Sequence, residues 1–305
     1  MPRLFRSLCI AAALALIACA PSRAGPAVVI SSKVSSESAM IAEMIRLALE
    51  AAGIPTTDRL ELGTTPLVRR ALLDGEIDLY IEYTGNGASF FHMPSNPAWK
   101  DLKLGYELGA RLDLERNRIV WLTPAPASNA WALAVRRDVA NAYHLRTMSD
   151  FARWVSGGGH VVLACSAEFA NGGALRSLEN TYGFRLRSQQ LIVLAGGETA
   201  AMITAAAAST NGTNTAMVYG TDGGIRAASL VLLEDDRHDQ PVYAPVPLIR
   251  EAVLRAHPQI ATLVKPIMEG LDRQRLQRLN ERVQVDGESI QAVARDYLER
   301  QGLLR

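Results

Sequence analysis

An aromatic ring and several polar side chains are expected to meet where a short buried strand ends. Apolar residues alternate with polar ones from 77 to 81, which indicates a strand, and residues 83–87 read Tyr-Thr-Gly-Asn-Gly, which indicates a turn. A helix is expected from Pro66 to Asp74, just before this strand, with the Thr65 hydroxyl as its cap and Pro66 at its first position, where a missing N–H costs nothing. Ligands of open α/β sheets bind at such strand ends, close to helix N-termini. The stretch 62–87 therefore predicts a binding site.

The same stretch resembles a known protein family. Its blocks LGTTPLVR and EYTGNG stand in one ordered series with SSKVSSES, LTPAPASNAWALAV, SAEF, LAGGETA, VYGTDGG and QPVYAPVPLIREAVLRAHP. This series is similar to the substrate-binding proteins of ABC importers for quaternary-amine osmoprotectants (glycine betaine, choline, carnitine), most of all to the low-affinity periplasmic glycine-betaine binding type. The resemblance covers nearly all of the mature chain. It implies a two-lobed type II periplasmic binding protein clamshell that captures a quaternary amine and delivers it to a membrane permease with its ATPase subunits.

A quaternary ammonium group explains why aromatic residues matter in such a site. The group has no N–H to donate, so ordinary hydrogen bonds cannot hold it. Its diffuse positive charge favours the faces of aromatic rings, and each good contact is worth about 0.5–2 kcal/mol. Only 6% of the residues are aromatic, so a cage for such a cation requires a few of them at defined places.

The resemblance assigns four aromatic residues to this cage, because they lie at loop or strand-end positions that match the family's ligand loops. They are Tyr83, Trp131, Tyr219 and Tyr243. Tyr83 and Tyr243 are expected from one lobe, and Trp131 and Tyr219 from the other, so that closure of the lobes assembles the cage. The alternative for each is a packing residue with one polar end, which is the usual role of Tyr or Trp at the end of a strand.

Three polar residues are candidates for the rest of the ligand. A betaine carboxylate needs donors, and helix N-termini offer free N–H groups with a partial positive charge. Ser38 and Thr65 stand at two expected helix starts, and Asn86 matches the last residue of the family's Tyr-Thr-Gly-Asx/Thr turn. Hydroxyls at such places also serve as plain helix caps, and this alternative stays open for Ser38 and Thr65.

The order of elements indicates two α/β lobes, each a mostly parallel sheet flanked by helices. Strands and helices alternate from 27 to 122 and again from 130 to 233, with helices expected at 102–117 and 174–182 and strands at 191–194 and 215–219. From Tyr243 the chain is expected to return to the first lobe, with helices near 261–269, 272–281 and 289–301. The expected domains are a signal peptide (1–24), a discontinuous lobe 1 (25–129 and 240–305) and lobe 2 (130–239).

The N-terminus indicates export. Arg3 and Arg6 precede an apolar run at 8–18, which is too short to span a bilayer. Two cleavage sites remain open: before Cys19, which would then be lipidated, or after Ala24, which would release a soluble product. Either one predicts a periplasmic protein.

Composition excludes several other classes of function. The chain carries 32 basic and 31 acidic residues, without a basic tract for nucleic acid. Cys9 falls in the signal, so Cys165 cannot form a disulfide within the folded body and is expected to be a buried small apolar residue. The sequence lacks a nucleophile elbow, a zinc-protease motif and a P-loop lysine, so we expect no enzyme, no metal and no cofactor. A monomer is expected.

Rival functions remain on sequence grounds. An enzyme on the same clamshell, acting on a small organic molecule, would need an acid–base pair or a nucleophile in the cleft. A periplasmic ligand sensor that signals to a membrane receptor is not separated from an importer component by these residues. The effector domain of a regulator is disfavoured, because the signal peptide leaves no room for a DNA-binding helix pair.

One loop departs from the family pattern. Many relatives carry an arginine after the SEF-like block that can pair with the ligand carboxylate, whereas residues 169–175 here read FANGGAL. The next arginine, Arg176, is expected inside the following helix, facing elsewhere. A bidentate Arg–carboxylate pair is normally a strong anchor. Its absence predicts weak betaine binding, or preference for a ligand without a carboxylate, such as choline.

Insertion of an arginine between Asn171 and Gly173 is therefore expected to tighten glycine betaine more than choline, because only the betaine has a carboxylate for the guanidinium. Isothermal titration of the wild type and the insertion variant with both ligands measures this difference. Equal changes for the two ligands would contradict the role assigned to the missing arginine.

Overall fold

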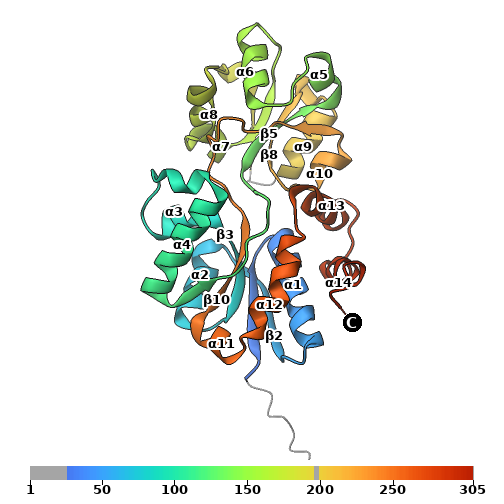
Figure 1. Ribbon diagram of the computed structural model, residues 1–305. Helices are drawn as coiled ribbons and strands as arrows, with labels where there is room; N and C mark the ends of the chain where they lie inside the picture. The colour runs from blue at the N-terminus through green and yellow to red at the C-terminus, as the bar shows by residue number, and fades with distance from the viewer. Residues whose placement is uncertain (1–25, 196–198, 305) are drawn as a thin grey trace, which may run out of the picture.

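Two sheets build the two lobes of the protein, and the computed structural model describes residues 26–195 and 199–304 (Figure 1). The expected signal peptide, with Cys19, lies outside these residues. The lobe 1 sheet has the order β2-β1-β3-β10-β4, formed by β1 (Val28–Lys33), β2 (Thr56–Gly63), β3 (Leu79–Tyr83), β4 (Ile119–Trp121) and β10 (Pro245–Arg250). The lobe 2 sheet has the order β7-β6-β8-β5-β9, formed by β5 (Trp131–Arg136), β6 (Leu163–Ser166), β7 (Leu191–Leu194), β8 (Thr215–Tyr219) and β9 (Leu230–Leu232).

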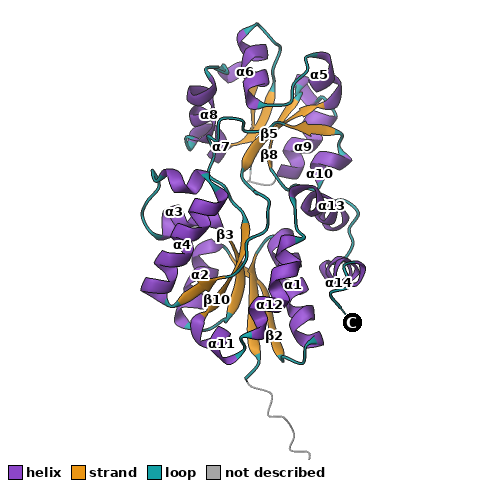
Figure 2. Ribbon diagram, viewed as in Figure 1, coloured by secondary structure: helices purple, strands orange, loops and turns teal. Residues whose placement is uncertain are grey.

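Each sheet contains one strand that runs against the other four. β10 pairs antiparallel with β3 and β4, and β5 pairs antiparallel with β8 and β9, while β1–β2, β1–β3, β6–β7 and β6–β8 are parallel. Both reversed strands are the first strand after the chain crosses from one lobe to the other (Figure 2). The chain enters each lobe at the edge that faces the other lobe, so an entering strand must run away from that edge.

β10 was not predicted from the sequence, because Pro245 and Pro247 argue against a central strand. The structure tolerates them because β4 pairs only with the end of β10, from Leu248 onward. Beyond the end of β4, the carbonyls of both prolines accept hydrogen bonds from the segment that follows it, at 2.8 and 2.9 Å. The missing proline N–H groups therefore fall where no partner strand needs them.

Helices cover both faces of each sheet (Figure 2). Those of lobe 1 are α1 (Ser36–Ala51), α2 (Thr65–Asp74), α3 (Gly87–Phe90), α4 (Leu102–Asn117), α11 (Glu251–Ala256), α12 (Gln259–Glu269), α13 (Arg273–Gln284) and α14 (Ile290–Arg300), with short 3₁₀ turns η1 (Thr84–Asn86) and η2 (Pro97–Lys100). Those of lobe 2 are α5 (Arg137–Ala142), α6 (Met148–Ser156), α7 (Ala167–Asn171), α8 (Ala174–Tyr182), α9 (Thr199–Ala207) and α10 (Gly224–Ala227).

Lobe 1 has a separate core on each face of its sheet. Leu79 and Ile81 of β3 face one core, together with α1, α12 and α14, whereas Tyr80 faces the other, together with α2 and α4. This alternation follows from the two-residue period of a strand. Lobe 2 has a core of its own, in which Cys165 is fully buried, as expected; burial raises the pKa of its thiol to about 11.

α13 makes a third contact between the lobes, beside the two crossing segments. A Cβ at Gly223, just before α10, would lie 2.1 Å from the backbone nitrogen of Glu281, so the two backbones touch there. Arg226 of α10 pairs with the Glu281 carboxylate at 2.6 Å, and Gln277 Nε2 donates to the Gly220 carbonyl at 2.9 Å. The helix α13, which belongs to the part of the chain that has returned to lobe 1, therefore also supports lobe 2.

The predicted two-lobed α/β class is confirmed, and the mixed sheets refine the prediction of mostly parallel ones. Long periodic helices were located well: α4 and α8 have the predicted bounds. The predicted cap of α2 was wrong, because the helix begins at Thr65 and Thr64 holds the capping position, from which its side chain makes no capping bond to the described residues. Pro66 therefore comes one position later than expected.

A buried ion pair ties α2 to α4 in lobe 1. The Arg69 guanidinium donates two hydrogen bonds to the fully buried Asp113 carboxylate, at 2.6 and 2.7 Å. Trp121 Nε1 donates to the same carboxylate at 2.8 Å. Removing one partner of such a pair leaves the other charge buried without compensation.

Asp113→Asn is expected to lower the free energy of unfolding by about 3–5 kcal/mol, because Arg69 loses its counter-charge. Asp74→Asn is the control, since its ion pair with Arg70 is largely exposed and worth about 0–1 kcal/mol. Urea denaturation of both variants measures the difference. Similar losses in the two variants would contradict the importance of the buried pair.

Candidate functional site

Strands of the two sheets end where the lobes face each other (Figure 1), and the four aromatic residues predicted to bind a ligand lie at or beside these strand ends. β1 and β3 end at this edge of lobe 1, and β6 and β8 end at the corresponding edge of lobe 2, where β5 begins. Trp131 and Tyr219 are direct partners across the β5–β8 pair, so their side chains share one face of the lobe 2 sheet. Tyr83 ends β3, and Tyr243 lies just before β10.

Tyr83 is 7% exposed, and its ring lies between two charged groups of lobe 1. Its hydroxyl donates to Glu37 Oε1 at 2.9 Å, and the Lys33 ammonium lies 4.8 Å from its ring centroid. Burial, followed by the charge of Glu37, raises the pKa of Tyr83 well above its ordinary value. The uncharged ring of Tyr83 therefore already makes a cation–π contact within the protein, with the Lys33 ammonium.

The carboxylate of Glu82 organises the polar groups around that cation. Glu82 is fully buried and forms an ion pair with Lys33. It also accepts hydrogen bonds from the Tyr80 hydroxyl at 2.9 Å and from Asn86 Nδ2 at 2.6 Å. The Asn86 amide is thus oriented by Glu82, and its nitrogen is engaged.

Tyr243 lies between the lobes. A Cβ at Gly85 would come within 2.9 Å of the Tyr243 ring, so the ring packs directly on the η1 backbone and requires a glycine there. Its backbone nitrogen donates to Ser128 Oγ at 3.0 Å, in the first crossing segment. Burial, then the charges of Glu82, Tyr219 and Glu168, raise the pKa of Tyr243, and these groups come from both lobes.

The lobe 2 side of the site is a pair of half-buried rings. Trp131 packs edge-to-face against Phe169, with centroids 5.9 Å apart and planes at 89°. Its indole Nε1 is buried and has no hydrogen-bond partner among the described residues. The Tyr219 backbone nitrogen donates to Asp222 Oδ2 at 2.8 Å, so Asp222 closes the turn after β8.

The two hydroxyl candidates differ in their surroundings. Ser38 is fully buried, and its Oγ accepts from the Lys33 backbone nitrogen at 3.2 Å, which makes it a link between α1 and β1. Thr65 is half-buried at the start of α2.

Glu37 was not selected from the sequence, although it is 3% exposed and lies in the first turn of α1. Its carboxylate accepts hydrogen bonds from Tyr83, from Asn129 Nδ2 at 3.1 Å and from Asn280 Nδ2 at 2.7 Å. Burial raises the pKa of Glu37, and hydrogen bonds from these residues and from the Thr221 side chain oppose that rise. The acid within the SSKVSSES block was the available signal, because a carboxylate in the first turn of a helix is stabilised by the helix dipole.

A family model described as the substrate binding domain of ABC-type glycine betaine transport systems matches residues 26–300. The chain belongs to this family. It is 47% identical over 283 residues to the glycine betaine-binding protein YehZ of Escherichia coli (strain K12), covering 92% of this chain and 93% of YehZ. It is 30% identical over 312 residues to the glycine-betaine-binding protein of Pseudomonas aeruginosa, covering all of this chain and 96% of that protein.

A solved structure of apo YehZ from E. coli is similar to this fold, with a TM-score of 0.85 and 46% identity over 92% of this chain and 100% of the other. The predicted family is therefore confirmed, and so is the type II periplasmic binding protein fold. Among the described residues of this family member, no helix is long and apolar enough to cross a membrane. No group of three or more His, Cys, Asp or Glu in the same residues could hold a metal ion.

The loop that lacks the family's arginine is largely helical. α7 ends at Asn171, and α8 begins at Ala174 after Gly173, whose φ of 101° suits a glycine. Arg176 is exposed on α8.

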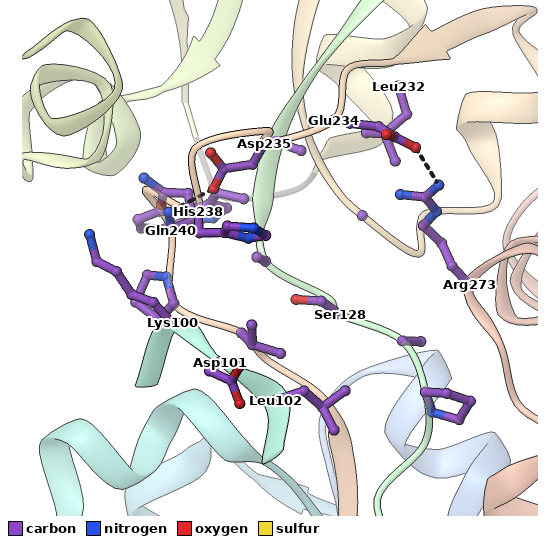
Figure 3. A pocket seen from close by; sticks show the side chains of 18 of the residues that line it. Lys100, Asp101, Leu102, Ser128, Leu232, Glu234, Asp235, His238, Gln240 and Arg273 are labelled. Atoms are coloured by element: carbon purple, nitrogen blue, oxygen red, sulfur yellow. Dashed lines mark hydrogen bonds and ion pairs between the residues drawn. The ribbon is translucent and has the colours of Figure 1, made fainter. Parts of the chain in front are cut away.

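A cavity of about 990 Å³ also runs along the crossing segments (Figure 3). Lys100 and Arg273 from lobe 1 face Glu234, Asp235 and His238 across it, and the 3.4 Å ion pair of Arg273 with Glu234 spans one side. Of the four predicted aromatic residues, Trp131 is the one that borders this cavity in the described part of the chain. The lining of this cavity thus carries charges of both signs, whereas Tyr83, Tyr219 and Tyr243 lie outside it.

The unpaired indole of Trp131 gives a prediction for stability. Trp121→Phe is expected to cost about 1–3 kcal/mol more in free energy of unfolding than Trp131→Phe, because only Trp121 donates to a buried carboxylate. Chemical denaturation of the ligand-free variants measures both losses. A larger loss for Trp131→Phe would show that its N–H has a partner in solution.

Proposed function

We propose that this protein is exported and captures a quaternary-amine ligand of the glycine betaine type between its lobes. The observation that carries the proposal is the position of four aromatic residues at the facing strand ends: Tyr83 ends β3 and Tyr243 precedes β10 in lobe 1, and Trp131 and Tyr219 are cross-strand partners in lobe 2. Relatives named as glycine betaine-binding proteins support the same ligand class. The aromatic faces would hold the trimethylammonium group by cation–π attraction.

The contact of Lys33 with Tyr83 supports this chemistry. An ammonium at 4.8 Å from the ring centroid is within the range in which a ring face attracts a cation. Lys33 has three N–H donors, and its ion pair with Glu82 does not use all of them. We propose that Lys33 binds the ligand carboxylate in place of the arginine missing from residues 169–175, with Asn86, Thr65 and Ser38 as further polar candidates.

Capture would require the lobes to move as two units. We assign lobe 1 to residues 25–129 and 240–305, and lobe 2 to 130–239, with the signal peptide at 1–24. The crossing segments between β4 and β5 and between β9 and β10 would then serve as the hinge. Closure about such a hinge buries a ligand that bridges both lobes.

We further propose where the protein works and with which partners. The protein would work in the periplasm as a monomer, free after cleavage at Ala24 or anchored through Cys19. It would present the loaded, closed form to a membrane permease and ATPase. It would carry out no reaction of its own and need no cofactor or metal.

Binding of choline and glycine betaine is expected to depend on the cage rings. Tyr219→Leu should weaken both ligands by about 2- to 30-fold, the loss of one cation–π contact. Isothermal titration measures the affinities, with 3,3-dimethyl-1-butanol as the uncharged isostere of choline. This alcohol is expected not to bind.

Tyr143→Leu is the matched control, because Tyr143 is 56% exposed and packs on Trp154, on the surface of lobe 2. It should leave both affinities unchanged. Equal binding of choline and the alcohol would remove the cation–π argument, and equal losses in the two variants would remove Tyr219 from the site.

A further inference from the structure

One carboxylate joins segments that lie far apart along the chain. Glu37, at the start of α1, accepts hydrogen bonds from β3 through the Tyr83 hydroxyl at 2.9 Å and from the first crossing segment through Asn129 at 3.1 Å. It also accepts from α13 through Asn280 at 2.7 Å and from lobe 2 through the Thr221 side chain. Asn280 also links α13 to lobe 2, because its amide nitrogen donates to the Thr221 carbonyl at 2.8 Å.

The partners of Glu37 are neighbours of the proposed cage. Tyr83 is itself a cage residue. Asn129 comes two residues before Trp131, and Thr221 comes two residues after Tyr219. A shift of any of these partners would therefore move a ring of the cage relative to the others.

We propose that Glu37 is a positioning residue, which fixes three cage rings of both lobes relative to one another and so sets the affinity for a cationic ligand. This inference rests on the proposed function. Glu37 acts through Tyr83, Asn129 and Thr221 rather than by contact with the ligand.

The ionised and protonated forms of Glu37 hold these partners differently. An ionised carboxylate accepts from all of them at once. A protonated carboxyl has an O–H that must find an acceptor, and the Oδ1 atoms of Asn129 and Asn280 are buried without a hydrogen-bond partner among the described residues. Rotation of either amide would present that oxygen, but it would withdraw the N–H that now holds Glu37. Protonation would therefore loosen the arrangement.

Other charged groups around Glu37 are already paired. On the β1–β3 side, Lys33 is paired with Glu82. On the α13 side, Glu281 is paired with Arg226, and after β8 Asp222 accepts from the Tyr219 backbone. Burial raises the pKa of Glu37 above its ordinary value, and the pKa of its neighbour Tyr83 is raised as well, so Tyr83 stays neutral.

Binding of a cationic ligand should become tighter as the pH rises. A cation in the cage favours the ionised form of Glu37, so binding releases a proton whenever Glu37 is protonated in the free protein. The Kd for choline should therefore fall as pH rises through the pKa of Glu37, by at most about tenfold per pH unit for one proton, and then level off. Choline suits this test because it has no group that titrates in this range.

Isothermal titration with choline from pH 5 to 8, in buffers of different ionisation enthalpy, measures both Kd and the proton release. The wild type should release a proton at low pH. Glu37→Gln, which keeps the shape but cannot ionise, should bind more weakly, with a flat pH profile and no proton release.

If Glu37→Gln does not fold, a second variant still tests the proposal. Thr221→Val removes one donor to the carboxylate, so the rise in affinity should move to higher pH. Thr204→Val is the control, because the exposed Thr204 hydroxyl donates to a carbonyl of its own helix, and it should leave the profile unchanged.

The possible results distinguish a failure of the role proposed for Glu37 from a failure of the proposed function. Saturable choline binding with the same pH profile in the wild type, Glu37→Gln and Thr221→Val would overturn the role of Glu37 alone. Absence of choline and betaine binding by the wild type at every pH would overturn the proposed function, and the inference with it.

Discussion

A carboxylate removed from water must be surrounded by hydrogen-bond donors, and this constraint organises the space between the two lobes. Removal of a charge from water costs several kcal/mol unless partners compensate it. Glu82 meets this need within lobe 1, from β1, β3 and η1. Glu37 meets it with donors from β3, a crossing segment and α13 and with the Thr221 side chain of lobe 2, so groups of both lobes compensate its charge.

The direction of the strands serves the same region. In each sheet four strands end, and the reversed strand begins, at the edge that faces the other lobe. Side chains that end β3 and β8 and that start β5 thus lie at the facing edges of the two sheets, although they come from three separate parts of the chain. The aromatic cluster follows from this topology, since Trp131 and Tyr219 become cross-strand partners only because β5 is reversed.

Local signals carried much of the prediction. The helices α4 and α8 and the strands β7 and β8 were found with their bounds, because apolar periodicity marks them and glycines flank α8 on both sides. β10 was missed because its prolines argue against a strand, and only the short length of β4 makes them harmless. The aromatic residues were located through the order of family motifs, whereas the partners of Glu37 were not. Asn280 lies 243 residues from Glu37, and single-sequence patterns do not report contacts at that separation.

The burial of Cys165 has a practical consequence for studies of motion in this protein. If the mature chain begins after Ala24, Cys165 is its one thiol, and it is fully buried with a raised pKa, so it resists alkylating dyes. One cysteine introduced on the surface of each lobe would then accept a fluorophore without removal of the native residue. Energy transfer between two such dyes would follow the rotation of the lobes in single molecules.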